Sequence, residues 1–514
     1  MRESHVVVIG AGAGGLAAAL DLAARGVAVT VCERAAAPGG KMRAVEVAGR
    51  AIDSGPTVLT MRWVLEQLFA DAGLALEDYV QTRRLDVLAR HHWQDGSVLD
   101  LFADREASAE AIGAFAGPAE ARGYRAFIAR AGRIFRTLEA SFMQAERPSP
   151  LGLAWRAGLR GLPALARVAP FATLWSELGR HFKDARLRQL FGRYATYCGA
   201  SPFAAPATLM LIAHAEQEGV WTVEGGMHRL ARAFAEAAAR RGAVFRYRAE
   251  VAAVLAETGR AHGVRLATGE EIEADAVIAT ADHAALRTGL FGPAAAAATA
   301  GSAPPRSLSA VTWSLAARAS GFPLLRHNVF FSRDYPEEFE TILGRRRLPD
   351  DPTVYLCAQD RGDPNDAEPE GTERLFCLVN APADGDTRPP TASEIARCEE
   401  RLFDRLRQAG LTLSERQAVV TGPEQFAALF PATGGALYGR ALHGWSAAFR
   451  RPGARTRLPG LLLAGGSVHP GAGVPMAILS GRLAAAAAVE HLSRRSVSIR
   501  RFAPAAISGG ISTA

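Results

Sequence analysis

Residues 5–15 read HVVVIGAGAGG, an apolar run that leads into closely spaced glycines. The run predicts a buried strand, and Gly10, Gly12 and Gly15 have the G-x-G-x-x-G spacing of a strand–turn–helix unit that binds a dinucleotide. Gly10 permits a tight turn, Gly12 lets a pyrophosphate approach the backbone, and Gly15 lets helix and strand pack closely. The free N–H groups at the start of the helix then face the phosphates.

A second strand is expected over residues 27–32, after a helix that ends near Gly26. It leads to Glu33, roughly 20 residues after the glycines, where a carboxylate accepts hydrogen bonds from an adenosine ribose. NAD and FAD both satisfy this fingerprint, so the motif alone does not choose between them.

The stretch that follows does favour one cofactor. Residues 33–57 read ERAAAPGGKMRAVEVAGRAIDSGPT, in which a Gly39–Gly40 turn precedes Lys41 and Arg43. Flexible backbone and positive charge thus come directly after the ribose position, and a DSGPT loop follows at 53–57. A plain NAD dehydrogenase needs no such second motif, so we expect FAD.

The far end of the chain carries a second glycine cluster. Residues 461–478 read LLLAGGSVHPGAGVPMAI, which predicts a short apolar strand and then a turn rich in Gly and Pro. A dinucleotide-binding fold that takes a late strand from the other end of its chain is typical of flavoproteins. His469 is a candidate proton acceptor, although in such a turn a structural hydrogen bond is the expected role.

These motifs resemble those of a known superfamily. The 33–57 stretch resembles the second conserved region of the flavin amine oxidases and phytoene desaturases. The sequence GVWTVEGGMHRLA at 219–231 and the HPGAGVP run resemble the bacterial phytoene-type carotenoid desaturases, over about residues 5–490. Within that family, PGGKMR at 38–43 and GGSVHPGAGVPMAILSGR at 465–482 are most similar to the 1-hydroxycarotenoid 3,4-desaturases of purple photosynthetic bacteria.

The resemblance implies a set of FAD contacts. Lys41 stands where Arg is common, so which of Lys41 and Arg43 meets the phosphates stays open. Ser467 stands where many FAD enzymes have Asp. The implied contacts are Gly10, Gly12, Gly15, Glu33, Arg34, Gly39, Gly40, Lys41, Arg43, Pro56, Thr57, Val251, Gly465, Gly466, Ser467, Val474 and Met476.

The resemblance also implies the reaction. An FAD-dependent oxidoreductase of this kind introduces a C3–C4 double bond into acyclic 1-hydroxy or 1-methoxy carotenoids of the hydroxyneurosporene type, with quinone or oxygen as the electron acceptor. The alternatives are phytoene desaturation and redox-neutral carotenoid isomerisation. More distant ones are an amine or porphyrinogen oxidase and a non-enzymatic prenyl-binding chaperone. No catalytic base and no metal site is assigned.

The expected fold class is α/β. We expect a Rossmann-like FAD-binding domain of the flavin amine oxidase and phytoene desaturase type, interleaved with an α+β substrate domain. The FAD-binding domain is expected to be discontinuous, over residues 1–84, 216–285 and 431–502. The other regions are a helical substrate and membrane-contact region (85–215), a substrate-domain sheet region (286–430) and a disordered tail (503–514).

Composition limits the remaining possibilities. The 514 residues carry a net charge of +7, which is too weak a bias over so long a chain to indicate nucleic-acid binding. Five scattered cysteines without a CxxC pair argue against a disulfide framework or a zinc site and favour a reducing, cytoplasmic compartment: Cys32, Cys198, Cys357, Cys377 and Cys398.

Membrane contact is expected without a membrane span. The two long uncharged windows, 194–213 and 458–481, are interrupted by Pro and Gly, so neither predicts a spanning helix. Residues 147–175 instead combine Trp155 and Trp175 with several arginines and no acidic residue, as in interfacial helices. A carotenoid dissolves in lipid, so we expect peripheral association with the inner membrane.

Overall fold

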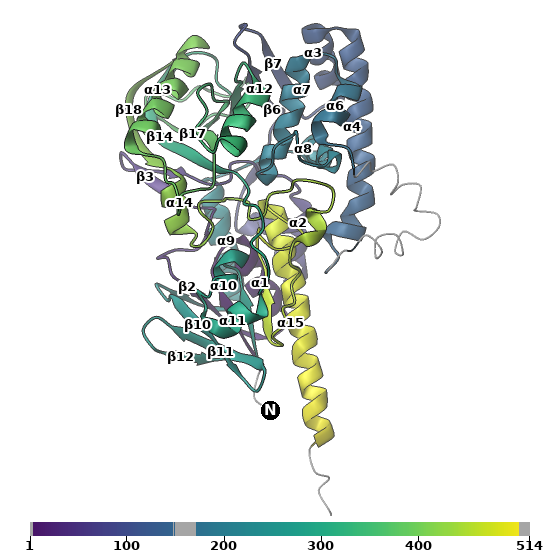
Figure 1. The fold of residues 1–514 in the computed structure, drawn as a ribbon, viewed down its shortest axis with the longest axis vertical. Coiled ribbons are helices and arrows are strands. Elements are labelled where there is room, and N and C mark those ends of the chain that lie inside the picture. The colour runs from purple at the N-terminus through teal and green to yellow at the C-terminus, as the bar shows by residue number, and fades with distance from the viewer. Residues whose placement is uncertain (1–3, 147–148, 150–170, 503–514) are drawn as a thin grey trace, which may run out of the picture.

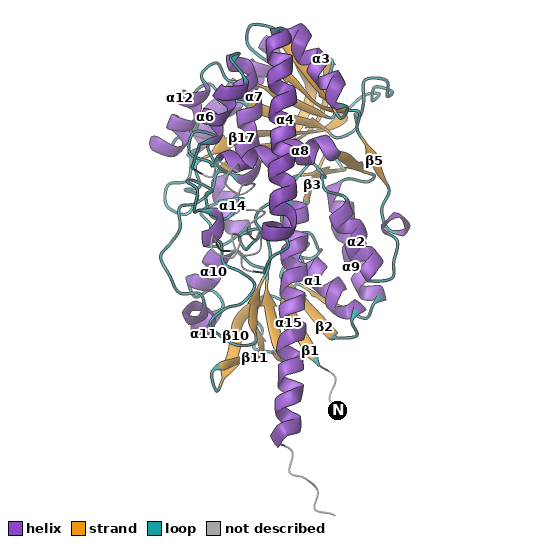
Figure 2. Cartoon of the chain, turned by 90° about the vertical axis from the view of Figure 1, so that its right-hand side faces the viewer, coloured by secondary structure: helices purple, strands orange, loops and turns teal. Residues whose placement is uncertain are grey.

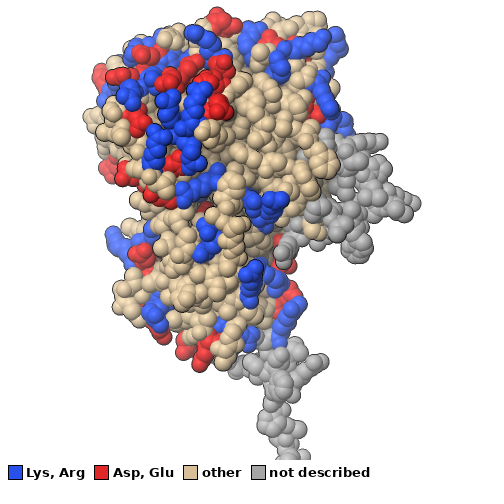
Figure 3. Space-filling model, viewed as in Figure 1, with Lys and Arg blue, Asp and Glu red and all other residues tan. Residues whose placement is uncertain are grey.

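The computed structural model describes residues 4–146, 149 and 171–502. Most of the 147–175 segment and all of the 503–514 tail lie outside the described residues. The chain forms two halves, one above the other in Figure 1, with strands β1, β2 and β10–β12 in the lower half and β14, β17 and β18 in the upper half. Charges of both signs are mixed on this face, most densely over the upper half (Figure 3).

A five-stranded sheet organises the lower half. Its order is β19-β13-β1-β2-β9, and every neighbouring pair is parallel. The late strand therefore pairs into the N-terminal sheet, as predicted. The strands are β1 (His5–Ile9), β2 (Ala28–Glu33), β9 (Val244–Tyr247), β13 (Ala276–Ala279) and β19 (Leu461–Leu463).

Both faces of this sheet are covered, as the continuous apolar strands require. Helix α1 packs against α9 and α15 on one face, where Val6, Val8 and Leu16 share a buried core with their side chains. The opposite face, with Val7 and Ile9, packs on a small antiparallel sheet and two short helices (Figure 2). The covering elements are α1 (Ala13–Ala24), α2 (Trp63–Asp71), α9 (Met227–Arg240), α15 (Val474–Phe502), β10 (Val251–Glu257), β11 (Arg260–Leu266), β12 (Glu271–Glu273), α10 (His283–Arg287) and α11 (Gly292–Ala298).

Glycines on both partners allow α1 and α15 to approach closely. A Cβ atom on Gly481 would collide with the carbonyl oxygen of Gly14, and one on Gly14 would lie 2.9 Å from the amide nitrogen of Gly465. The C-terminal segment is therefore fitted directly against the first helix of the fold.

A seven-stranded sheet organises the upper half, in the order β18-β14-β17-β16-β15-β6-β7. Helix α13 (Ala392–Gln408) buries Leu402 and Phe403 against it, beside Trp313. Two strands at one edge of this sheet come from the 85–215 region, whose sequence pattern was interpreted as helical. They join the sheet because β6 pairs in parallel with β15. The strands are β6 (Val87–His92), β7 (Val98–Phe102), β14 (Ser309–Gly321), β15 (His327–Phe330), β16 (Val354–Ala358), β17 (Glu373–Ala381) and β18 (Leu411–Thr421).

The rest of the 85–215 region is a helical layer against one end of this sheet, with an aromatic core around Phe127, Phe182 and Phe191. None of the described helices combines the length and apolar character needed to cross a bilayer. The layer comprises α3 (Arg105–Ala116), α4 (Pro118–Leu138), η2 (Glu139–Met143), α6 (Leu174–His181), α7 (Ala185–Gly192), η3 (Arg193–Cys198), η4 (Ala207–Met210) and α8 (Leu211–Glu218).

Short elements complete the connections between the halves. They include two small antiparallel pairs, β3–β4 and β5–β8. Their bounds are β3 (Ala44–Val47), β4 (Arg50–Asp53), η1 (Leu76–Asp78), β5 (Thr82–Arg84), β8 (Trp221–Val223), α12 (Tyr335–Phe339), η5 (Glu340–Gly344), α14 (Pro423–Leu429) and η6 (Ala448–Arg450).

Candidate functional site

The carboxyl ends of four parallel strands open into one large cavity of about 1280 Å³. Gly10 follows β1, Glu33 ends β2, Thr280 follows β13 and Gly465 lies just beyond β19, and all four line the cavity. Ligands of open α/β sheets bind at this edge. Every residue predicted to contact FAD lines the cavity except Gly15, whose added Cβ would collide with the carbonyl oxygen of Gly10. Gly15 therefore has the helix–strand packing role that the fingerprint assigns to it.

The start of α1 is prepared for an anion. Gly12 is the N-cap and supplies no side-chain cap, and the first turn of the helix holds no acidic residue. A Cβ atom on Gly12 would meet nothing within 4 Å, so open space adjoins the backbone where a pyrophosphate needs to approach. Glu33 is buried beside it and accepts hydrogen bonds from the amides of Ala11 (2.7 Å) and Ala35 (2.8 Å). These features fit a dinucleotide cofactor.

The Gly39–Gly40 turn lies directly on the fingerprint. The amide of Gly39 donates to the carbonyl of Ala11 at 2.8 Å, and a Cβ atom on Gly40 would lie 3.1 Å from the Cα of Gly12. Gly40 also has φ +57°, which favours glycine. The structure thus brings together two motifs that the sequence analysis treated separately.

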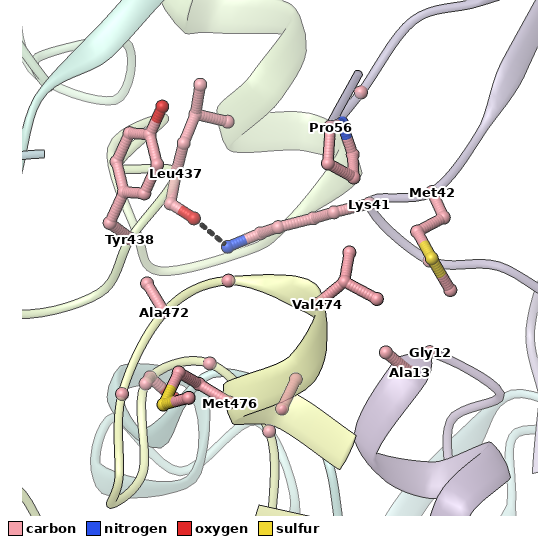
Figure 4. A pocket seen from close by; sticks show the side chains of 18 of the residues that line it. Gly12, Ala13, Lys41, Met42, Pro56, Leu437, Tyr438, Ala472, Val474 and Met476 are labelled. Atoms are coloured by element: carbon pink, nitrogen blue, oxygen red, sulfur yellow. Dashed lines mark hydrogen bonds between the residues drawn. The ribbon is translucent and has the colours of Figure 1, made fainter. Parts of the chain in front are cut away.

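Lys41 and Arg43 both line the cavity but point to different partners. Lys41 reaches between Pro56 and Val474 and donates to the carbonyl of Leu437 at 2.6 Å (Figure 4). Arg43 donates to the hydroxyls of Ser54 and Thr421, each at 3.1 Å. Burial lowers the pKa of both side chains.

The late turn supplies the opposite wall. Ser467 accepts a hydrogen bond from the amide of His283 at 3.1 Å, which ties the turn to the loop after β13. Val474 and Met476 lie in the first turn of α15 and line the cavity, and Figure 4 shows Val474 facing Lys41.

His469 is buried and does not line the cavity. Its Nε2 atom lies 2.9 Å from the carbonyl oxygen of Phe142, and its ring packs edge-on to the Phe142 ring. Burial lowers the pKa of His469 to about 4, so the imidazole is neutral at physiological pH. This geometry supports the structural role over proton transfer.

A polar cluster in the cavity wall was missed by the sequence analysis. Arg193, Tyr197, Glu216 and Tyr355 line the cavity among apolar side chains. They come from η3, α8 and β16, which carry no cofactor motif. The sequence did contain one indication of this cluster. Arg193 and Glu216 are charged residues that lie on either side of the long uncharged window 194–213. Among the described residues, no group of His, Cys, Asp and Glu is arranged to hold a metal ion.

Comparison with known proteins decides the family. Residues 13–489 match the flavin containing amine oxidoreductases. The chain belongs to that family. A hydroxyneurosporene desaturase of Rubrivivax gelatinosus is 53% identical over 100% of this chain and 98% of its own length. A zeta-carotene-forming phytoene desaturase of Myxococcus xanthus is 32% identical, over 93% of this chain and 92% of its own.

Solved structures confirm the fold. An oxidoreductase from Methanosarcina mazei superposes with a TM-score of 0.57 over 93% of this chain and 99% of its own, at 17% identity. The predicted α/β fold of the flavin amine oxidase type and the resemblance to carotenoid desaturases are both confirmed. The cofactor of this family member is FAD, for which the cavity at the strand ends is suited.

Substituting Gly12 tests the cofactor site without disturbing the protein around it. Gly12→Val places a branched side chain in the open space beside the helix N-terminus, so flavin absorbance after gel filtration should fall to a small fraction of the wild-type ratio. Gly301→Val is the matched control, because Gly301 is exposed and its added Cβ also meets nothing within 4 Å. Full flavin content in Gly12→Val contradicts the assignment.

Replacing His469 tests its structural role. Since its pKa is lowered from 6.5 to about 4, the unfolded chain takes up a proton that the folded protein does not, so stability falls as the pH drops below about 6.5. His469→Gln should make the free energy of unfolding, measured with urea between pH 4 and 7, depend less steeply on pH. The slope should decrease by an amount that corresponds to at most about one proton. The variant should also retain flavin and turnover. Loss of turnover with unchanged flavin and an unchanged pH slope contradicts the structural role.

Proposed function

We propose that the protein is an FAD-dependent desaturase that introduces a C3–C4 double bond into acyclic 1-hydroxy or 1-methoxy carotenoids. The observation that carries the proposal is the continuity of the cavity. From the glycine motifs it extends without a break between the helical layer and the seven-stranded sheet, where Leu209, Ile212, Phe376, Leu378 and Leu442 line it. An elongated apolar molecule fits such a space.

The relatives favour this substrate over the alternatives. Identity to a hydroxyneurosporene desaturase is 53% over the whole chain, against 32% to a phytoene desaturase. The first relative's name supports desaturation of a carotenoid that bears an end-group oxygen, which a redox-neutral isomerase or an amine oxidase does not perform.

Desaturation removes a hydride and a proton from adjacent carbons. FAD supplies the hydride acceptor when it is bound. Positive charge left beside a polyene spreads over the conjugated chain, so the protein's main work is to align the substrate and exclude water. The apolar side chains of the wall, such as Leu209, Ile212 and Phe376, suit both tasks.

The proposal includes the cofactor contacts and the domain division stated above. The five strands of the parallel sheet all fall within residues 1–84, 216–285 and 431–502, which supports a discontinuous FAD-binding domain. The cavity-lining residues Gly10, Gly12, Glu33, Gly39, Gly40, Gly465 and Gly466 form its backbone cradle. Val251 also lines the cavity, two residues after Ala249, whose amide donates to the carbonyl of Glu33 at 2.9 Å.

Peripheral association with the inner membrane also belongs to the proposal, with quinone or oxygen as the acceptor. Phe171 and Trp445 are 77% and 44% exposed, their rings are 5.4 Å apart, and both line the cavity. Exposed side chains that also line a cavity mark its mouth, and an apolar mouth suits a substrate that comes from lipid. Trp175, by contrast, is half-buried against Phe203, so Phe171 and Trp445 are the better candidates for lipid contact.

The substrate is tested with purified flavoprotein and an added quinone. A 1-hydroxy carotenoid of the hydroxyneurosporene type should be converted, and its absorption bands should move to longer wavelength because the new double bond extends the conjugation. Phytoene should react slowly or not at all. Rapid multi-step conversion of phytoene without action on the hydroxylated substrate would move the assignment to phytoene desaturase.

Membrane contact is tested by sedimentation with anionic liposomes. The wild type should sediment with them and be released by detergent, and the Phe171→Glu, Trp445→Glu double variant should shift to the supernatant. Val244→Glu is the matched control, because Val244 is 56% exposed at the edge of the parallel sheet, away from the cavity lining. A wild type that stays in the supernatant is evidence against the membrane contact.

A further inference from the structure

A positively charged side chain faces the apolar cavity. Arg193 begins η3 and lines the cavity. Its guanidinium lies over the rings of Tyr197 and Tyr355, 5.3 and 5.1 Å from their centroids, and Nη1 donates to the Tyr197 hydroxyl at 3.3 Å. Within the described residues it forms no salt bridge. A guanidinium has five N–H donors, so donors remain for a ligand.

The charge of Arg193 is balanced only indirectly. Glu216 is buried, and burial raises its pKa, while hydrogen bonds from Tyr194 and Tyr197 and the charge of Arg193 act in the opposite direction. The Tyr194 hydroxyl donates to it at 2.6 Å. Tyr197 thus stands between Arg193 and Glu216 and holds the guanidinium in place, and no carboxylate of the described residues pairs with its remaining donors.

The position of Arg193 suits one end of the proposed substrate. Tyr355, under the guanidinium, shares a hydrogen bond of 2.6 Å with the Thr57 hydroxyl, and Thr57 belongs to the proposed FAD contacts. The guanidinium is therefore linked through Tyr355 to the 53–57 loop, which belongs to the proposed FAD contacts. In a 1-hydroxy or 1-methoxy carotenoid the oxygen is on C1, so three bonds separate it from C3 of the C3–C4 bond.

We propose that Arg193 is the specificity-determining residue for the end-group oxygen, to which it donates a hydrogen bond, and that Tyr197 and Tyr355 position it. The inference rests on the proposed function. A guanidinium donates and cannot accept, so a hydroxyl and a methoxyl oxygen serve it equally well. A hydrocarbon end leaves the charge without a partner in an apolar space, and sites built in this way reject the analogue that lacks the oxygen.

The test compares three substrates with the purified flavoprotein: a 1-hydroxy carotenoid, its 1-methoxy form and the same polyene without the oxygen. For the wild type, kcat/KM should be similar for the first two and at least about tenfold lower for the third. Arg193→Met should lower kcat/KM for both oxygenated substrates by roughly tenfold to a hundredfold and leave the hydrocarbon unchanged. Arg193→Gln, which keeps neutral donors, should be intermediate.

A matched control and a binding measurement complete the design. Arg188→Met removes a guanidinium that also lies over an aromatic ring, Trp175, but outside the cavity lining, and it should keep the wild-type preference. Tryptophan fluorescence quenching gives the affinity for each carotenoid independently of turnover, and the same order is expected.

Two results overturn the inference. One is a wild type that binds and converts all three substrates equally, and the other is an Arg193→Met variant that keeps the preference for oxygen. If Arg193→Met loses its flavin, the Arg193→Gln variant is the test. A wild-type preference for the oxygenated substrates in Arg193→Gln then also contradicts the inference. Failure of the wild type to convert any carotenoid refutes the proposed function instead, and the quenching titration still decides whether Arg193 selects the oxygen.

Discussion

The structure depends on the close contact between the first helix and the last segment of the chain. At Gly14 and Gly481, backbone meets backbone with no room for a side chain, and the amide of Gly465 lies beside the same helix. This contact sets the late turn at the carboxyl edge of the parallel sheet. Without it the part of the cavity wall formed by Ser467, Val474 and Met476 has no fixed position.

The remaining architecture follows from how that edge is used. The uncapped N-terminus of α1 favours an anion, and the buried carboxylate of Glu33 accepts hydrogen bonds. The two lie close together, which suits the diphosphate and the ribose of an adenosine diphosphate group. The upper half contributes mainly apolar walls to the same cavity, with Arg193 and Glu216 as charged exceptions. We therefore propose that one half recognises the polar cofactor and the other the apolar substrate, with residues 54–57 in the shared cavity wall.

The sequence predicted the parts of the site that depend on local backbone. Gly10, Gly12, Gly15, Gly39 and Gly40 could be identified because a tight turn or a close approach requires glycine at fixed spacing. Arg193, Glu216 and Tyr355 could not, because they meet only after the helical layer packs on the seven-stranded sheet. Strands β6 and β7 were missed for a related reason, since their pairing with β15 depends on a partner far along the chain.

The edge position of β19 has a consequence for synthesis on the ribosome. Chains emerge N-terminus first, so strands β1, β2, β9 and β13 are available long before the strand and helix that complete their sheet. The cofactor cradle is finished only when Gly481 has left the ribosome and α15 has packed against Gly14. A polypeptide that stops short of Gly481 lacks one wall of the proposed cradle, and flavin retention thereby reports whether translation has passed this residue.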